Sequence, residues 1–128
     1  MKKILSLFVA ALFATTVYAG EYPDISIKDL QAAIKAGKVA VIDVNGANSF
    51  TKRGHIPGAV SFSNKDALSK QLSNVGKDTL VVASCGNPRC SAYKRGASAA
   101  EELGFKNVKH LSAGIAGWLK AGKKVEKN

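Results

Sequence analysis

The sequence predicts an α/β domain in which helices cover both faces of a central parallel sheet. Short, nearly continuous apolar runs, typical of strands buried on both faces, alternate with segments of helical periodicity. Strands that alternate with helices in this way usually pair in parallel. The chain has 128 residues, of which 46% are hydrophobic and 22% charged. This length and composition indicate one globular domain with one core.

The first predicted helix begins at Ser26 and ends at Gly37. Ser26 and Asp29 form a capping box in which aspartate replaces the usual glutamate, and glycine commonly follows the last turn of a helix. The apolar run over residues 39–44 then predicts a strand. The domain therefore starts with a helix that leads into the sheet.

The remaining elements continue the alternation, with boundaries at capping residues, glycines and apolar runs. In chain order they are a loop over residues 46–57, a strand over 59–62, a helix from a cap at Ser63 or Asn64 through Leu72, a strand over 80–83, a loop over 84–90, a helix over 91–103, a strand over 107–111 and a helix over 113–121. Four strands and four helices are thus predicted in all.

Two of these helices have features that indicate how they pack. The last helix carries Trp118, an expected core anchor. One face of the 91–103 helix consists mostly of small residues, namely Ala92, Gly96, Ala99, Ala100 and Leu103. Small side chains on that face predict a close approach of the helix backbone to the sheet.

The first 19 residues have the pattern of a secretory signal peptide. Two lysines precede an apolar run over residues 4–14, and Val-Tyr-Ala at 17–19 places small residues where a signal peptidase needs them. The run is shorter than the roughly 20 apolar residues of a spanning helix. The sequence therefore predicts cleavage after Ala19, a periplasmic or secreted location, and one mature domain over residues 20–128 without stable membrane insertion.

The chain is strongly basic. Its formal net charge is +10, and loss of the two leader lysines would lower it to +8. Such a surplus can indicate nucleic-acid binding or attraction of small anions. The lysines are scattered along helices and in the C-terminal tail, and no aromatic-interleaved basic stripe occurs. The sequence therefore predicts no nucleic-acid partner.

Residues 85–91, Cys-Gly-Asn-Pro-Arg-Cys-Ser, connect a predicted buried strand to a predicted helix. Ligands bind outside the carboxyl ends of parallel strands, and a helix N-terminus adds partial positive charge there. Backbone N–H groups of such a loop can form an anion cradle in which Cys85 would ionise readily. Cys85 is therefore a candidate nucleophile, with an inert buried thiol as the alternative, and Arg89 is a candidate contact for an anionic substrate.

Five segments occur in a fixed order along the chain. They are Val41–Val44, Gly-His-Ile-Pro-Gly-Ala at 54–59, the cysteine loop, Leu-Gly-Phe-Lys-Asn-Val at 103–108 and Gly-Ile-Ala-Gly-Trp at 114–118. Together they resemble the rhodanese-like sulfurtransferase family, over residues 25–122. The resemblance implies a three-layer domain whose central parallel sheet has about four to five strands.

The resemblance also implies a thiosulfate sulfurtransferase-like enzyme with no metal or organic cofactor. The active cysteine, here Cys85, would take a sulfane sulfur from a donor such as thiosulfate, become a persulfide, and pass the sulfur to a thiophilic acceptor. The expected partners are a small sulfur-containing anion, a thiol acceptor and, as a further candidate, a protein sulfur acceptor. Substrate would lie against the loop residues Gly86, Asn87, Pro88, Arg89, Cys90 and Ser91.

The chain departs from the family pattern at two positions. Asn45 stands where members often have arginine. Cys90 stands where many have the arginine that precedes the helix, and Arg89 lies one residue earlier. Two interpretations of Cys90 follow. It could close a short disulfide with Cys85, which contributes little stability, or serve as a resolving thiol that attacks the Cys85 persulfide or protects Cys85 by reversible bonding.

Other polar residues suggest alternative chemistries. Phosphatases and arsenate reductases on this fold have an arginine six positions after the cysteine, where this chain has Ser91, and phosphoryl transfer needs that arginine. His55 and His110 lack the paired spacing of a zinc site. His55 is expected to fix a turn instead, and Asp43 is a candidate support for the cysteine loop.

Three function classes remain open at this point. They are a catalytic sulfurtransferase, a redox or persulfide carrier that depends on a protein partner, and a rhodanese-like binding module without turnover. Sulfur uptake by Cys85 is the property that separates the first two classes from the third.

The signal pattern generates a direct prediction. The exported protein should begin at Gly20, because the small residues at 17–19 place the cleavage site after Ala19. N-terminal sequencing of the exported protein checks this. Recovery of intact Met1 in a membrane fraction would contradict it.

Overall fold

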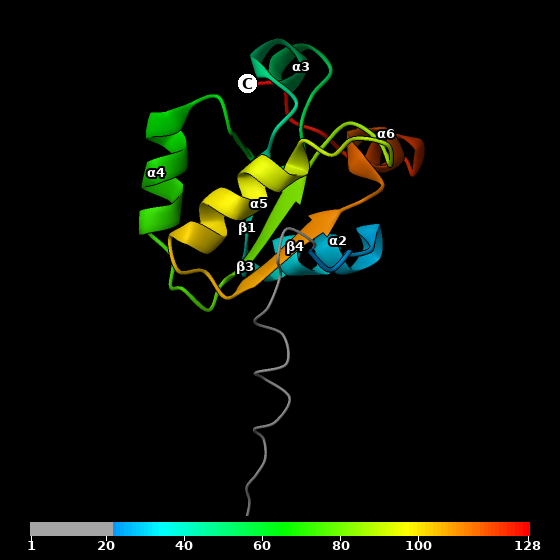
Figure 1. Cartoon of the computed structure of the whole chain (residues 1–128). Coiled ribbons are helices and arrows are strands. Elements are labelled where there is room, and N and C mark those ends of the chain that lie inside the picture. The colour runs from blue at the N-terminus through cyan, green and yellow to red at the C-terminus, as the bar shows by residue number, and fades with distance from the viewer. Residues whose placement is uncertain (1–21) are drawn as a thin grey trace, which may run out of the picture.

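The computed structural model describes residues 22–128, so the predicted signal peptide over residues 1–19 lies outside the described part of the chain. Figure 1 shows a central sheet with helices on both of its faces. Its strands pair in parallel, in the order β2-β1-β3-β4. The predicted α/β architecture is confirmed, with four strands in the sheet.

The strands are short, and the two central ones are almost entirely buried. Their bounds are β1 Val39–Asp43, β2 Val60–Ser61, β3 Leu80–Ser84 and β4 Asn107–Leu111. β3 lies between β1 and β4, and their last residues Asp43, Ser84 and Leu111 are in register. These carboxyl ends form the edge at which α/β domains bind ligands.

Four of the described helices lie in two layers, one on each side of the sheet, and the short helix Ala47–Lys52 lies beyond the ends of the strands in Figure 1. Their bounds are α2 Ile27–Ala36, α3 Ala47–Lys52, α4 Lys65–Ser73, α5 Tyr93–Glu102 and α6 Gly114–Lys120. Figure 1 shows α4 and α5 on the near face, with α2 and α6 on the other side. The described domain therefore has three layers, as predicted.

Alternate side chains of the central strands form two apolar clusters, one on each face. In β3, Val81 and Ala83 pack with α4 and α5, whereas Val82 packs with α2 and α6. Side chains of a strand point alternately to opposite faces, so a strand covered on both sides must be apolar at every position. This requirement explains the continuous apolar runs in the sequence.

Capping residues set the ends of two helices as predicted. The Ser26 hydroxyl accepts a hydrogen bond of 3.0 Å from the N–H of Asp29. Gly37, with φ of 69°, ends α2 in the left-handed conformation that glycine tolerates. Of the two candidate caps for α4, the one used is Asn64, whose side-chain oxygen accepts 3.1 Å from the N–H of Ala67.

The prediction of an uninterrupted loop over residues 46–57 is wrong, because Ala47–Lys52 forms α3. Gly46 occupies the cap position of α3, where glycine is tolerated, so its presence does not exclude a helix. α3 has no buried residue. A short exposed helix lacks the apolar stripe by which periodicity is recognised.

The face of α5 that packs on the sheet differs partly from the prediction. Its buried residues are Gly96, Ala97 and Ala100. Leu103, predicted on this face, is 53% exposed. A Cβ atom added to Gly96 would lie only 3.0 Å from Cγ1 of Val44. The predicted close approach is therefore present, and it depends on a glycine.

The C-terminal tail is tied to the domain at two points. The indole N–H of Trp118 donates 2.7 Å to the carbonyl of Lys124. Further along, His55 and Glu126 exchange two backbone hydrogen bonds of 2.8 and 2.9 Å. The C-terminus accordingly lies beside α3 in Figure 1.

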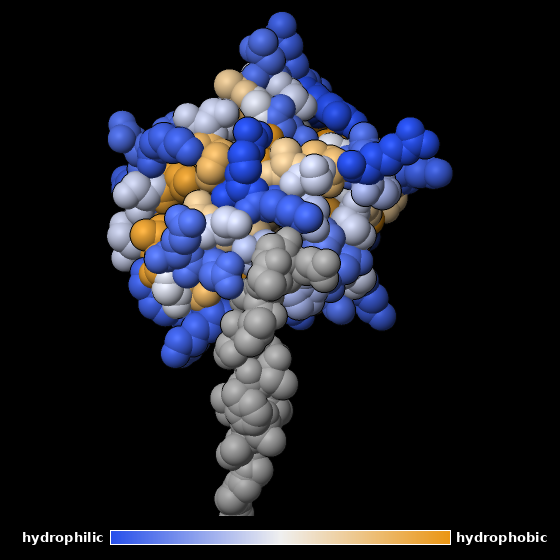
Figure 2. Space-filling view, viewed as in Figure 1, coloured by the Kyte–Doolittle hydropathy of each residue, from blue (hydrophilic) through white to orange (hydrophobic). Residues whose placement is uncertain are grey.

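Hydrophilic side chains project over most of the face seen in Figure 2, with apolar atoms gathered between α4 and α5. This distribution agrees with scattered, solvated lysines. Within residues 22–128, no helix combines the length and the hydropathy needed to cross a bilayer.

Trp118 is predicted to be a large contributor to stability, because it is 2% exposed and holds the tail by its indole N–H. Replacement by alanine should lower the free energy of unfolding by about 3–5 kcal/mol. The neighbouring Leu119 is 38% exposed, so Leu119→Ala should change it by no more than about 0.5 kcal/mol. Urea unfolding of both variants checks this, and equal effects would contradict it.

Candidate functional site

The cysteine loop lies between the end of β3 and the start of α5. It leaves the sheet at Ser84, whose register neighbours are the last residues of β1 and β4. The chain resumes helical structure at Tyr93, two residues later than the sequence predicted. The loop is therefore at the carboxyl edge of the sheet, where the sequence predicted a ligand site.

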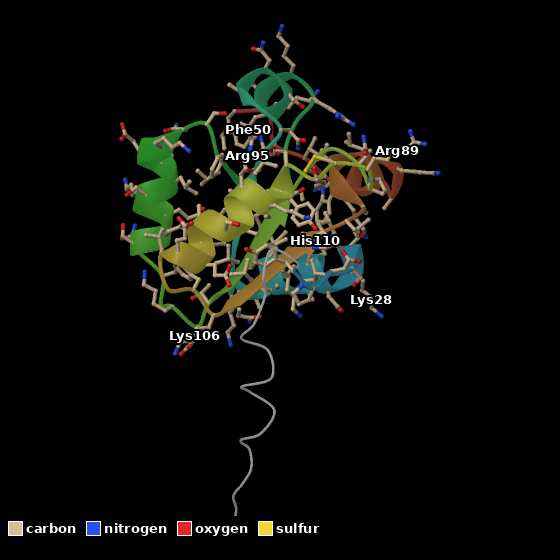
Figure 3. The ribbon with its side chains drawn as sticks, viewed as in Figure 1. Lys28, Phe50, Arg89, Arg95, Lys106 and His110 are labelled. Carbon is tan, nitrogen blue, oxygen red and sulfur yellow. A yellow bond between two sulfur atoms is a disulfide. The ribbon has the colours of Figure 1, made fainter. Side chains whose placement is uncertain are left out.

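Cys85 and Cys90 are joined by a disulfide, which Figure 3 shows as a yellow bond at the start of α5. Their Cα atoms are 5.9 Å apart, within the range typical of disulfides. Cys85 is 2% exposed, whereas Cys90 is only partly buried. The structure thus contains the disulfide of the first interpretation of Cys90. The second interpretation, a resolving thiol, requires the same short distance between the two cysteines.

A backbone donor lies against the sulfur of Cys85. The N–H of Tyr93 donates to Cys85 Sγ at 3.0 Å. Tyr93 is the first residue of α5, where N–H groups have no acceptor within the helix and the helix dipole is positive. This donor can stabilise a Cys85 thiolate. The sequence predicted a helix start at Ser91, two residues too early, and no side-chain pattern indicated that the Tyr93 N–H would reach the sulfur.

Within the loop itself, two backbone amides donate hydrogen bonds to Asn87. The N–H of Arg89 donates 2.8 Å to the Asn87 side-chain oxygen, and the N–H of Cys90 donates 3.1 Å to its carbonyl. Pro88 has no N–H to contribute. In the disulfide-bonded state, the loop is thus a closed turn around Asn87, and the donor on the Cys85 sulfur comes from α5.

The start of α6 fixes the other side of the loop. Ile115 N–H donates to the Cys85 carbonyl and Ala116 N–H donates to the Gly86 carbonyl, both at 2.9 Å. Gly114 precedes them with φ of 66°, and a Cβ atom there would lie 2.6 Å from the Asn87 nitrogen. The loop and α6 therefore meet through their backbones, at a separation that only glycine permits.

Asp43 supports the turn that follows β1 and contacts the loop indirectly. Its side chain is 2% exposed and accepts 2.7 Å from the N–H of Asn45. Burial raises the pKa of Asp43 above the usual aspartate value, although the hydrogen bond from Asn45 opposes this shift. The Asn45 side chain in turn lies beside Gly86, its oxygen 3.3 Å from the position of an added Cβ.

A cavity of about 250 Å³ adjoins the disulfide. Both cysteines and the whole turn from Asn87 to Ser91 line it, together with Tyr93, Lys94, His110, Leu111 and Ser112. Arg89 and Lys94 are the charged side chains among these residues, and Figure 3 shows Arg89 at the outer end of the loop. The cavity is small, polar in part and cationic, which suits a small anion.

His110 lies on the floor of this cavity. Its ring stacks on that of Tyr93, with centroids 4.1 Å apart. Its Nδ1 atom is buried without a hydrogen-bond partner among the described residues. The sequence placed His110 at a strand end and assigned it no role beside the cysteines.

His55 has a structural environment away from the cysteines. It is 2% exposed, stacks on Phe50 at 3.5 Å between centroids, and donates from Nδ1 to the Phe50 carbonyl at 2.8 Å. It thus fixes the turn after α3, as expected. A larger groove of about 800 Å³ runs past it along β2, lined by neither cysteine. No cluster of potential metal ligands occurs in the described range 22–128.

Comparison with known proteins identifies the fold. The family model of the rhodanese-like domain matches residues 26–121. The chain belongs to this family. Among solved structures, the BH2092 protein from Bacillus halodurans is 30% identical to this rhodanese-like chain, with a TM-score of 0.68. That match covers 82% of this chain and 77% of the other.

Two further structural neighbours are named as sulfur transferases. A thiosulfate sulfurtransferase from Pseudomonas aeruginosa is 20% identical, with a TM-score of 0.66 over 84% of this chain and 21% of its own. The polysulfide-sulfur transferase homodimer from Wolinella succinogenes is 19% identical, with a TM-score of 0.62 over 88% of this chain and 81% of its own. At these identities the matches show a shared rhodanese-like fold.

The contact at Gly114 generates a matched pair of predictions. Gly114 and Gly122 both have left-handed φ angles, but an added Cβ has nothing within 4 Å at Gly122. Both alanine variants should therefore carry backbone strain of about 1–2 kcal/mol. Gly114→Ala should lower the free energy of unfolding further than Gly122→Ala does, because the added methyl group would separate α6 from the loop. It should also alter the reactivity of the reduced Cys85 thiol.

Urea unfolding and the rate of thiol alkylation measure these two effects. A wild-type alkylation rate and equal destabilisation in the two variants would show that the backbone contact at Gly114 does not position the loop.

Proposed function

We propose that this rhodanese-like chain is an exported sulfurtransferase that carries a sulfane sulfur as a persulfide on Cys85. The observation that carries the proposal is the hydrogen bond of 3.0 Å from the Tyr93 N–H to Cys85 Sγ. A helix N-terminal donor at the sulfur favours the thiolate, which is the nucleophilic form of cysteine. Cys85 is also the cysteine that the family resemblance assigns to catalysis.

The donor half-reaction is a displacement at sulfur. The Cys85 thiolate attacks the sulfane sulfur of a donor such as thiosulfate, a new S–S bond forms on Cys85, and sulfite leaves with the electron pair of the broken bond. The cavity of about 250 Å³ beside Cys85 and the cations Arg89 and Lys94 support a small sulfur-containing anion as donor. Residues of the Gly86–Ser91 loop are its expected contacts.

The acceptor half-reaction returns the cysteine to its starting state. A thiophilic acceptor, such as cyanide or a thiol, attacks the outer sulfur of the persulfide, and the Cys85 thiolate is the leaving group. The Tyr93 N–H that favours thiolate formation also favours this departure, because it stabilises the same charge. A protein thiol on a partner is an acceptor of the same class.

In this proposal, the Cys85–Cys90 disulfide marks a reversible oxidised state of the protein, in which Cys85 has no free thiolate to act as nucleophile. Disulfides persist in oxidising compartments, so the bond supports export, which the leader sequence also predicts. The same bond favours a second candidate function, a redox or persulfide carrier that needs a protein partner for each cycle. Retention of sulfur without transfer to small acceptors would distinguish that carrier.

The proposal predicts that transfer from thiosulfate to cyanide depends on Cys85 and on a reductant. Cys85→Ser should reduce transfer to background, because the nucleophile is lost. Air-oxidised wild type should be inactive until reduced, whereas Cys90→Ser should be active without reductant but more readily over-oxidised at Cys85. Thiocyanate formation and a thiol count measure these properties.

Mass spectrometry of reduced Cys90→Ser protein after thiosulfate treatment supplies the decisive control, because this variant has no second cysteine thiol that could displace the bound sulfur. One added sulfur on Cys85 supports either transferase or carrier. A Cys85 that takes up no sulfur would leave the third class, a binding module without turnover. Unchanged turnover in Cys85→Ser would remove this residue from the mechanism.

A further inference from the structure

We infer that the reduced chain releases its bound sulfur as sulfide, with Cys90 as the attacking thiol and an external dithiol as the reductant. The inference rests on the proposed function, because Cys85 must first take up a sulfur. It adds a reaction, the reduction of sulfane sulfur to sulfide, and a class of partner. In that reaction the thiol that attacks the Cys85 persulfide is part of the chain itself.

The geometry brings the Cys90 sulfur to the inner sulfur of a Cys85 persulfide. The two Cα atoms are 5.9 Å apart and the Sγ atoms are bonded. Cys90 precedes α5, and its N–H donates a hydrogen bond of 3.1 Å to the Asn87 carbonyl. The Cys85 carbonyl accepts a hydrogen bond of 2.9 Å from the N–H of Ile115 in α6. Both cysteines therefore lie on backbone segments fixed at the distance that the reaction requires.

The reaction balances as a thiol–disulfide exchange. The Cys90 thiol loses its proton and its sulfur attacks Cys85 Sγ, forming the Cys85–Cys90 bond. The bond between Cys85 Sγ and the outer sulfur breaks, and the outer sulfur leaves as hydrosulfide with the electron pair and one proton. The two cysteines are oxidised by two electrons, and the sulfane sulfur is reduced by two. The protein product is the disulfide present in the structure.

Regeneration should begin at Cys90, because the two bonded sulfurs differ in access and in charge stabilisation. Cys85 is 2% exposed, whereas Cys90 is more accessible and lines the cavity. The Tyr93 N–H donates a hydrogen bond to Cys85 Sγ. Because this donor stabilises negative charge on Cys85, Cys85 is a better leaving group than Cys90. An incoming thiolate therefore binds Cys90 as a mixed disulfide and releases the Cys85 thiolate.

A dithiol reductant can resolve the mixed disulfide without a second thiol compound. Its second thiol attacks the bond to Cys90, closes a disulfide within the reductant, and returns Cys90 as a free thiol. The net reaction converts thiosulfate and a dithiol to sulfite, sulfide and the oxidised dithiol. In this inference the electrons come from a compound outside the chain, of the dithiol class.

A single-turnover experiment tests the inference. Wild type, Cys90→Ser and Cys85→Ser are reduced, freed of reductant under anaerobic conditions and mixed with thiosulfate. Wild type should release one sulfite and one sulfide per chain and end as the disulfide without added sulfur. Cys90→Ser should release the sulfite but keep one sulfur on Cys85 until a thiol is added. Cys85→Ser should release neither product.

The products separate failure of the inference from failure of the proposed function. Sulfite without sulfide from wild type, with sulfur retained on either cysteine, would overturn the inference and leave sulfur uptake intact. Absence of sulfite would overturn both. Circular dichroism and thermal unfolding confirm that the variants are folded.

A second arm tests the site of regeneration. Oxidised wild type is treated briefly with glutathione, quenched with acid and digested for peptide mapping. The glutathione adduct should be on Cys90, because Cys85 is buried. An adduct found mainly on Cys85 would overturn the assigned order of attack.

Discussion

Cys85 is held between two helices that reach it from opposite faces of the sheet. Tyr93 of α5 donates to its sulfur, and Ile115 of α6 donates to its carbonyl. Both donors lie in a first helical turn, where backbone N–H groups need acceptors outside the helix. The position of the sulfur therefore depends on how both helices pack, and so on both apolar clusters of the core.

The oxidised bond affects chemistry more than stability. Cys85 and Cys90 are five positions apart, and a disulfide that closes so small a loop removes little entropy from the unfolded chain. Most members of the apolar cluster around Cys85 are side chains of the strands, α4 and α5. Reduction of the disulfide is therefore expected to leave the overall fold in place.

The sequence predicted the parts of the fold that side-chain patterns encode. Continuous apolar runs gave the buried strands, and Ser26 gave the start of α2. α3 was missed because it buries no residue, and the α5 face was misjudged near Leu103. At the site, Cys85 follows from its motif, whereas the Tyr93 N–H has no side-chain signature. The sequence did not decide whether Cys85 and Cys90 form a disulfide, because the same spacing suits both a structural disulfide and a resolving thiol.

The contact of Gly96 with the sheet links core packing to reactivity. Gly96 lies one helical turn beyond Tyr93, and Val44 occupies the space where its side chain would begin. The absence of a Cβ at Gly96 thus sets the distance between α5 and the strands, and with it the distance from the Tyr93 amide to the Cys85 sulfur. An enlarged residue at this buried position would act as a spacer, tuning the acidity of a cysteine it never touches.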